Sequence, residues 1–225
     1  MTGEDGIAAA LGHQFARPSL LAEALTHRSA AQGKGRRGAG SNERLEFVGD
    51  RVLGLVMAEW LIERFPGEQE GELGRRFAHL VSRPVLAEVA ASLGLGTALR
   101  IAPNEARAGL GAQANALADT MEAVIGALFM DAGLDPPRRF VRGAWASAME
   151  GHERPPTDPK TALQEWMMAR GLPLPAYAVS ERSGPSHKPE FVILVSGAGQ
   201  SGTGTGGSKR EAERAAASDL LGKLG

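Results

Sequence analysis

The chain has 225 residues, which is enough for one large domain or two smaller ones with a proper core. It contains no cysteine, which excludes disulfides, thiolate metal sites and a cysteine nucleophile, and its formal net charge of -1 excludes a polycation, so any nucleic-acid-binding surface must be local. No apolar run reaches the roughly 18 residues that cross a bilayer, and the first residues lack the basic region of a secretory signal, so we expect a cytoplasmic protein without membrane contact.

The first 150 residues show the apolar spacing of helices and form one expected all-helical region. Residues 32–41 (QGKGRRGAGS) are a predicted loop whose basic residues indicate either a solvated segment, which is the commoner case, or a contact with phosphate. Residues 94–111 are a second predicted loop, on the surface. The expected helices cover residues 4–12, 19–26, 42–64, 72–82, 84–93, 112–132 and 135–150.

The helix expected at 42–64 carries three acids on one face. At about 100° per residue, Glu43, Glu46 and Asp50 fall within about 60° of one another. Acids in a first helical turn complement the helix dipole, which accounts for Glu43 and Glu46 but not for Asp50. Two interpretations stay open, a cation site and a solvated face. The rest of the helix is apolar nearly all round, which predicts burial of Val52, Leu53, Leu55, Val56, Met57, Trp60, Leu61 and Ile62.

A second pair of acids lies in the helix expected at 112–132. Asp119 and Glu122 are three residues apart and therefore share one face, which Ala123 and Gly126 continue with small side chains. Gly54 likewise continues the acidic face of the earlier helix. Small residues would let the two backbones approach closely, with Gly54 at the closest point, so that five acids converge on one pocket. A solvated face is the alternative for this pair.

The character of the sequence changes after residue 150. Residues 151–159 (GHERPPTDP) are typical of an interdomain linker. A helix is expected at 160–170, followed by strands with alternating apolar residues around Tyr177 and around Ile193, a glycine-rich run at 197–207 and a last helix. The order is α-β-β-β-α. We interpret the glycine run as a turn and not as a nucleotide loop, because no βαβ unit surrounds it, and we expect no nucleotide cofactor.

Carboxylates without cysteine or histidine companions suit hard cations such as Mg²⁺ or Mn²⁺ better than zinc. His13, His27, His79 and His152 have no spacing typical of a zinc site, and we interpret them as structural or surface residues. Two hard cations about 3.5 to 4 Å apart can activate water and stabilise the leaving oxygen in phosphodiester hydrolysis. The acids therefore favour phosphodiester chemistry if they converge.

Residues 42–50 (NERLEFVGD) resemble the signature of ribonuclease III, and residues 118–123 (ADTMEA) resemble the second acidic motif of that family. The segment from residue 158 (DPKT) onward is similar to the family's C-terminal double-stranded RNA-binding domain, and residues 26–29, 70–71 and 202–204 also match. The resemblance implies an all-α catalytic domain (1–150), a linker (151–159) and an α+β RNA-binding domain (160–225).

By this resemblance the protein would hydrolyse double-stranded RNA with Mg²⁺ or with Mn²⁺ as a substitute, leaving 5′-phosphate and 3′-hydroxyl ends. Ribosomal and messenger RNA precursors would be its substrates. Glu43, Asp50, Glu70 and Glu122 would be catalytic, with Glu43 and Glu70 as supporting acids near the scissile phosphate. The implied metal ligands are Glu46, Asp50, Asp119 and Glu122.

The resemblance also implies a homodimer in which Phe47 packs into the partner subunit. Its direction, within about 40° of Glu43 and away from the apolar stripe, indicates that it leaves its own core, although an ordinary core aromatic is the alternative. In the second domain Thr161 and Gln164 would meet one minor groove of the RNA and His187 the next. Lys209 and Arg210, at a helix N-terminus, would bind phosphates.

One position departs from the family pattern, because Glu213 stands where this domain commonly has a third basic residue. Binding by the RNA-binding domain alone is therefore expected to be weak. Two other functions stay open: a non-catalytic protein that binds double-stranded RNA, and a metal-dependent phosphohydrolase of small substrates, which would leave the second domain unexplained.

Overall fold

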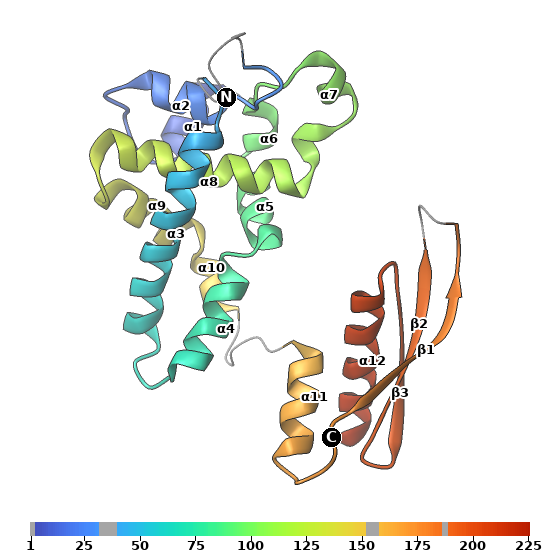
Figure 1. Ribbon diagram of the computed structural model, residues 1–225. Coiled ribbons are helices and arrows are strands. Elements are labelled where there is room, and N and C mark those ends of the chain that lie inside the picture. Colours follow the sequence, from blue (N-terminus) through green and yellow to red (C-terminus); the bar gives the residue numbers. More distant parts are fainter. Residues whose placement is uncertain (1–2, 32–39, 152–157, 186–188) are drawn as a thin grey trace. The chain divides into compact units, whose positions relative to one another are not determined.

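The computed structural model describes residues 3–31, 40–151, 158–185 and 189–225. The chain divides into two compact units, Met1–Pro155 and Pro156–Gly225, which are coloured from blue to yellow and from orange to red in Figure 1. Each unit has its own cluster of buried apolar side chains. Within the described ranges no helix is long and apolar enough to cross a membrane.

The first unit is helical, as the sequence predicts. Its described part also contains one isolated parallel bridge, between Thr26 and Arg100. The loop expected at 94–111 instead holds three short helical segments, and Leu95 within it is fully buried, so it is not a simple surface excursion. The elements are α1 (Glu4–Ala10), α2 (Pro18–Ala24), α3 (Glu43–Arg64), α4 (Glu70–Leu80), α5 (Arg83–Ser92), α6 (Leu95–Ala98), α7 (Pro103–Arg107), η1 (Leu110–Ala112), α8 (Ala114–Ala132), α9 (Asp135–Ala144) and α10 (Ala146–Glu150).

The helix expected at 135–150 is divided in two at Trp145. The indole of Trp145 is fully buried, and its N–H donates a hydrogen bond to the carbonyl oxygen of Leu80 at 2.9 Å. This anchor at the end of α4 fixes the position of the Trp145 side chain, and α9 and α10 meet there.

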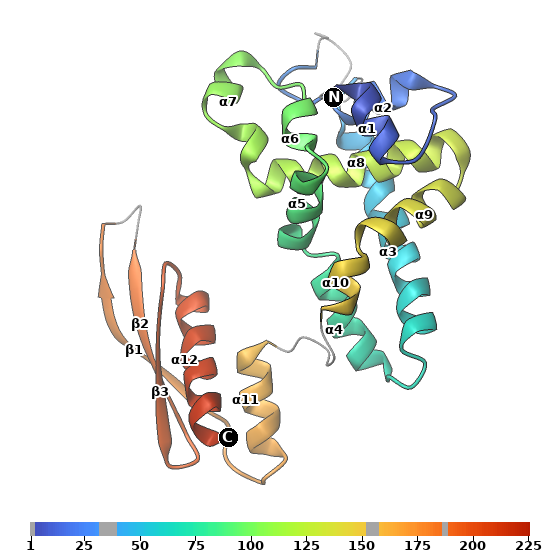
Figure 2. The same cartoon turned by 180° about the vertical axis from the view of Figure 1, so that it is seen from behind.

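Helix α8 lies at the centre of the first unit. It is apolar nearly all round, and α2, α3 and α5 pack against it, so that most of its residues are buried. In Figures 1 and 2 it crosses the N-terminal half of α3. This crossing brings the two acidic segments of the sequence together.

Glycines allow the crossing, but not at the position that the sequence indicated. A Cβ atom at Gly49 would lie 1.7 Å from the carbonyl oxygen of Glu122, and one at Gly126 would lie 2.1 Å from that of Leu45. At Gly54 the nearest atom would be the ring of Phe77 on α4, at an ordinary 3.5 Å. The expectation for Gly126 was correct and that for Gly54 was wrong, because α8 crosses α3 more than one turn before Gly54.

The predicted burial of α3 was also too general. Val52, Leu53, Val56, Met57 and Leu61 are buried, but Leu55 and Ile62 are 58% and 62% exposed. Phe47 is 63% exposed on the same side of the helix. Three large apolar side chains on this side of α3 are therefore exposed in the single chain.

The second unit contains α11 (Pro159–Met168), the strands β1 (Ala176–Ser183), β2 (Glu190–Gly197) and β3 (Gln200–Gly206), and α12 (Lys209–Leu224). The strands form an antiparallel sheet in the order β1-β2-β3. Helix α12 packs against β2 and β3, and α11 packs against α12. The core joins Leu163 and Met167 of α11, Ile193 and Val195 of β2, and Ala212, Ala216, Ala217 and Leu220 of α12.

The glycine run is largely a strand and not a turn, which corrects our interpretation. Gly202, Gly204 and Gly206 lie in β3, and α12 lies so close that a Cβ atom at Gly204 would be 2.1 Å from the backbone nitrogen of Ala216. A Cβ atom at Gly202 would be 2.6 Å from the carbonyl oxygen of Ala216. The glycines thus serve helix-on-sheet packing, which leaves no phosphate loop.

Candidate active site and RNA-binding surface

A pocket of about 590 Å³ lies where α3 and α8 cross. The N-terminal half of α3 forms one wall, and the middle of α8, the first residue of α5 and the segment after α2 form the others. Its lining mixes five acids with three arginines. The lining residues are His27, Arg28, Asn42, Glu43, Glu46, Phe47, Asp50, Arg51, Arg83, Asp119 and Glu122.

Three of the four expected metal ligands form a tight cluster in this pocket. Glu46, Asp119 and Glu122 each offer a carboxylate oxygen, and these oxygens lie within 4.8 Å of one another. Asp50, the fourth, lines the same pocket, but its carboxylate pairs with the guanidinium of its neighbour Arg51 at 2.9 Å. The cluster can hold a divalent cation, because its donors are all oxygens at the spacing that one ion spans.

The charges in the cluster are not balanced. Burial, followed by repulsion from Asp50, Glu46 and Asp119, raises the pKa of Glu122 to about 7. Burial and the Asp119 carboxylate also raise the pKa of Glu46 above its ordinary value. A group of carboxylates held together against their repulsion binds a cation favourably, because the cation relieves both effects.

Three arginines enter this acidic pocket, and the sequence prediction did not include them. Arg28 lies 3.9 Å from Glu43, and Arg83 donates to Asp119 at 2.8 Å. Arg28 belongs to the matched segment 26–29, and Arg51 follows Asp50 directly, so the sequence held a signal for both. Arg83 stands in no such segment, and only the packing of α5 against α8 reveals it.

His27 also lines the pocket. Its Nδ1 lies 2.8 Å from Ser29 Oγ and 3.5 Å from a carboxylate oxygen of Glu105, and Ser29 Oγ accepts a hydrogen bond from the Ala102 N–H at 3.1 Å. These contacts tie the segment after α2 to the segment around α7. His27 therefore has a structural role, as the sequence indicated, in a wall of the pocket.

The two supporting acids are placed differently. Glu43 lines the pocket, where it accepts a hydrogen bond from Ser41 Oγ at 3.1 Å. Glu70 begins α4, beyond the C-terminal end of α3, which lies about 27 Å along the helix from Glu46 at about 1.5 Å per residue. The single chain thus does not bring Glu70 to the cluster.

The second unit has a hollow of about 460 Å³ between α11, α12 and the segment before β1. Three of the residues expected to contact RNA, Thr161, Gln164 and Arg210, line this hollow together with Lys160 and Arg214. Lys209 is exposed at the start of α12. His187 lies outside the described residues.

The exceptional acid of this domain is engaged with the lysines around it. The Glu213 carboxylate accepts a hydrogen bond from Lys160 at 2.6 Å and lies 3.9 Å from Lys209. Lys160 also lies 4.8 Å from the centre of the Tyr177 ring. Glu213 therefore neutralises part of the positive charge that this surface would offer to phosphates.

Two family models match the chain. The model described as ribonuclease-III-like matches residues 17–148, and the double-stranded RNA binding motif matches residues 159–224. The first match covers the helices that build the acidic pocket, and the second covers the unit with the basic hollow. Both expected parts of the chain are thus found, in the expected order.

Curated relatives match over nearly the whole chain. Ribonuclease 3 of Azorhizobium caulinodans is 46% identical over 96% of this chain and 92% of its own length, and that of Dinoroseobacter shibae is 46% identical over 95% and 92%. The solved nuclease domain of ribonuclease III from Campylobacter jejuni aligns with a TM-score of 0.58 at 33% identity, over 63% of this chain and 98% of that domain. The chain therefore belongs to the ribonuclease III family of double-stranded RNA endoribonucleases.

Proposed function

We propose that the pocket between α3 and α8 is the centre at which this endoribonuclease hydrolyses double-stranded RNA, with Mg²⁺ as its cation and Mn²⁺ as a substitute. The observation that carries the proposal is the convergence of Glu46, Asp119 and Glu122, whose oxygens lie within 4.8 Å of one another. A purely structural site would pair each of these carboxylates with a cation of the protein; Arg83 pairs with Asp119, but burial and the neighbouring acids leave Glu122 with a pKa of about 7.

The donor set fits a hard divalent cation. Glu46, Asp119 and Glu122 would hold it, and Asp50 would join them by leaving Arg51. Bound divalent cations would lower the pKa of the attacking water and neutralise charge on the phosphate. The products would be 5′-phosphate and 3′-hydroxyl ends.

The protein's own groups contribute positioning. Glu43, at the exposed edge of the pocket, lies beside Arg28 and would orient water or the RNA strand near the scissile phosphate. Asp50 and Glu122 would act in catalysis as well as in cation binding. The tight α3–α8 crossing fixes the spacing of these groups, because neither helix can shift without breaking the contacts at Gly49 and Gly126.

We also propose that the protein is a homodimer through the open face of α3. Phe47, Leu55 and Ile62 are exposed apolar side chains on this face, and the solved Campylobacter jejuni nuclease domain is described as structurally flexible in a region involved in dimer formation. If two α3 helices pair antiparallel, the C-terminal end of each α3 approaches the pocket of the other copy. Glu70 would then act in its partner's pocket. Sedimentation tests this directly, since Phe47→Asp should yield monomers; an unchanged dimer would refute the role of this face.

The second unit supplies the grip on RNA. We propose that five of its residues contact the duplex: Thr161, Gln164, His187, Lys209 and Arg210. We also propose that the two domains span residues 1–150 and 160–225, with a linker between them. The proposed location of the protein is the cytoplasm. A module of this kind reads the shape of A-form RNA and not its sequence. Duplex regions of ribosomal and messenger precursors are accordingly the proposed substrates.

A cleavage assay on long duplex RNA tests the proposal. We expect cleavage with Mg²⁺ or Mn²⁺, no cleavage with EDTA, and ends that a ligase or kinase identifies as 5′-phosphate and 3′-hydroxyl. Cleavage that persists in EDTA would refute the metal mechanism. Binding without cleavage at any Mg²⁺ concentration would favour a non-catalytic RNA-binding protein.

A further inference from the structure

We propose that Arg83 is a catalytic residue which binds the RNA phosphate at the cleavage site and thereby makes cation binding depend on RNA. This inference rests on the proposed cation site between α3 and α8. Arg83 comes from α5, and neither acidic motif includes it.

The geometry places Arg83 over the cluster with donors to spare. Its Nη1 donates to Asp119 Oδ1 at 2.8 Å, and its side chain lines the pocket while remaining 57% exposed. A guanidinium has five N–H donors in a planar fork, and this bond uses one of them. The remaining donors can take a phosphate oxygen that enters the pocket.

The other two arginines of the pocket are placed less well for this role. Arg51 donates to Asp50 and to the carbonyl oxygen of Phe47, and its guanidinium stacks 4.0 Å from the centre of the Phe47 ring. Arg28 lies at the outer acid, Glu43, at 3.9 Å. Among the three, Arg83 is bonded to a member of the tight cluster.

A divalent cation and Arg83 compete for Asp119 when RNA is absent. Both are positive and both approach the same carboxylate, so each weakens the binding of the other. A phosphate in the pocket reverses this relation, because its negative charge can lie between the guanidinium and the cation. Arg83 then stabilises the bound phosphate and the charge that develops on its oxygens during hydrolysis.

Arg83→Gln should therefore change two properties in opposite directions. Mn²⁺ alone should bind the RNA-free protein more tightly, by about three- to tenfold in calorimetry, because a competing charge is gone. Single-turnover cleavage at saturating Mn²⁺ should slow by about ten- to a hundredfold, because a charged donor to the phosphate is lost. A merely structural role of Arg83 does not predict tighter cation binding.

Two further variants complete the experiment. Arg83→Lys keeps the charge, so its Mn²⁺ affinity should stay near that of the wild type, while cleavage falls because an ammonium group lacks the planar fork. Arg142 lies outside the pocket and pairs with Glu63, with 2.7 Å between the charged atoms. Arg142→Gln should therefore change neither the Mn²⁺ affinity nor the cleavage rate. Circular dichroism checks that each variant is folded.

The outcomes separate the two proposals. If the wild-type protein binds no Mn²⁺, the proposed cation site fails and the inference with it. If the wild type binds Mn²⁺ but both Arg83 variants match it in cation affinity and cleavage, the cation site stands and the inference is overturned. Should Arg83→Gln fail to fold, normal cleavage by Arg83→Lys would still overturn the direct contact with phosphate.

Discussion

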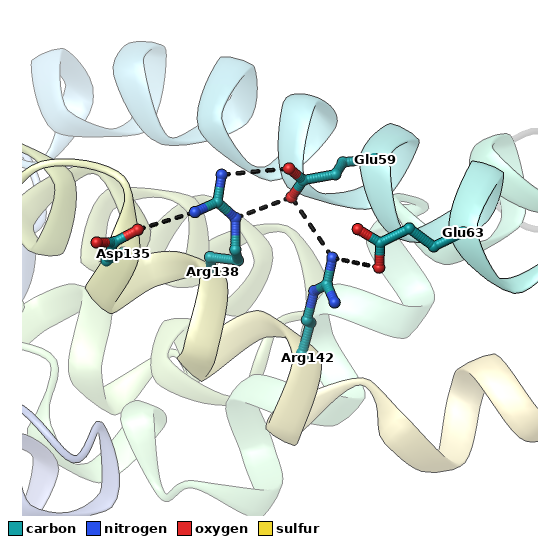
Figure 3. Close-up of polar contacts among 5 residues, drawn as sticks. All are labelled: Glu59, Glu63, Asp135, Arg138 and Arg142. Carbon is teal, nitrogen blue, oxygen red and sulfur yellow. Dashed lines mark hydrogen bonds and ion pairs between the residues drawn. The ribbon is translucent and has the colours of Figure 1, made fainter.

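The two ends of α3 carry acids of the same kind in opposite settings. Near its C-terminal end, Glu59 and Glu63 face α9, where Arg138 donates to Glu59 at 2.8 Å and Arg142 lies 2.7 Å from Glu63 (Figure 3). Arg138 also holds Asp135 at 2.8 Å. Near the N-terminal end, Glu46 faces other carboxylates instead. The C-terminal end of α3 thus pairs its acids with arginines of α9, whereas at the N-terminal end Glu46 lies among carboxylates, although Asp50 has an arginine partner there.

The pKa values follow this difference. Hydrogen bonding to Arg142 lowers the pKa of Glu63 below its ordinary value, whereas burial and neighbouring acids raise those of Glu46 and Glu122. The paired acids join α3 to α9 and leave nothing for a ligand. The negative charge of the crowded acids is not fully neutralised by the protein, and we infer that the cation-binding and catalytic function resides there.

The largest effect is expected on the rate of cleavage when an acid is removed from the cluster and not from the paired end of α3. Glu122→Gln removes a negative charge and a cation ligand, and it should slow single-turnover cleavage about a thousandfold while RNA binding in Ca²⁺ stays unchanged. Glu63→Gln makes the same chemical change at the paired end and should cleave at nearly the wild-type rate. Similar rates for the two variants would remove the distinction between the ends.

The second largest effect is expected on stability, when the close crossing of α3 and α8 that brings the acids together is disturbed. Gly49→Ala would place an ideally positioned Cβ atom 1.7 Å from the carbonyl oxygen of Glu122, so α8 must move away from α3. We expect a loss of about 3 kcal/mol or more in the free energy of unfolding, measured by urea denaturation, together with loss of cleavage.

Gly54→Ala is the matched control, because its methyl group meets only the Phe77 ring at 3.5 Å. It should gain about 0.5 to 1 kcal/mol from the better helix propensity of alanine. Equal stability of the two variants would show that the α3–α8 contact is looser than the structure has it.

The position at which α3 and α8 cross could not be predicted from the sequence. The acids, the helices that carry them and the strands around Tyr177 and Ile193 follow from local spacing, and the structure confirms them, whereas β3 lies in the glycine run that we interpreted as a turn. Which glycine is the contact point depends on where α8 crosses α3, and one helix face allows several such points. Gly54 was a reasonable choice on an isolated helix, and the packing selects Gly49.

The role of Arg83 and the exposure of Leu55 and Ile62 could not be predicted from the sequence for the same reason. Arg83 reaches Asp119 because α5 packs on α8, a contact between segments 36 residues apart. Leu55 and Ile62 are apolar like their buried neighbours, and only the arrangement of the other helices leaves their side of α3 open. Local pattern specifies elements and candidate chemistry, but long-range packing decides which side chains share a site.

A smaller effect concerns stability without cation. Since the folded pKa of Glu122 is about 7 against an ordinary 4.5, the folded protein retains a proton between these values that the unfolded chain has lost. In EDTA this group makes stability fall as pH rises from about 4.5 to 7, and its effect levels off above that. The midpoint of thermal unfolding should therefore show a downward component that Glu122→Gln lacks. Parallel curves for the two proteins would contradict the crowding at Glu122.

The smallest effect is expected on the affinity for duplex RNA. In the second unit an acid, Glu213, lies beside lysines that would otherwise be available to bind RNA phosphates. Glu213 holds Lys160 at 2.6 Å and lies 3.9 Å from Lys209, so phosphates must compete with it for both. Glu213→Gln should tighten binding to duplex RNA by about two- to fivefold and steepen its salt dependence, because more counterions are released. Asp219→Asn makes the same charge change on α12, where Asp219 pairs with Lys223 at 2.7 Å, and its effect should be smaller. Fluorescence anisotropy at several salt concentrations measures both, and equal gains would mean that net charge, and not the Lys160 pair, limits the affinity.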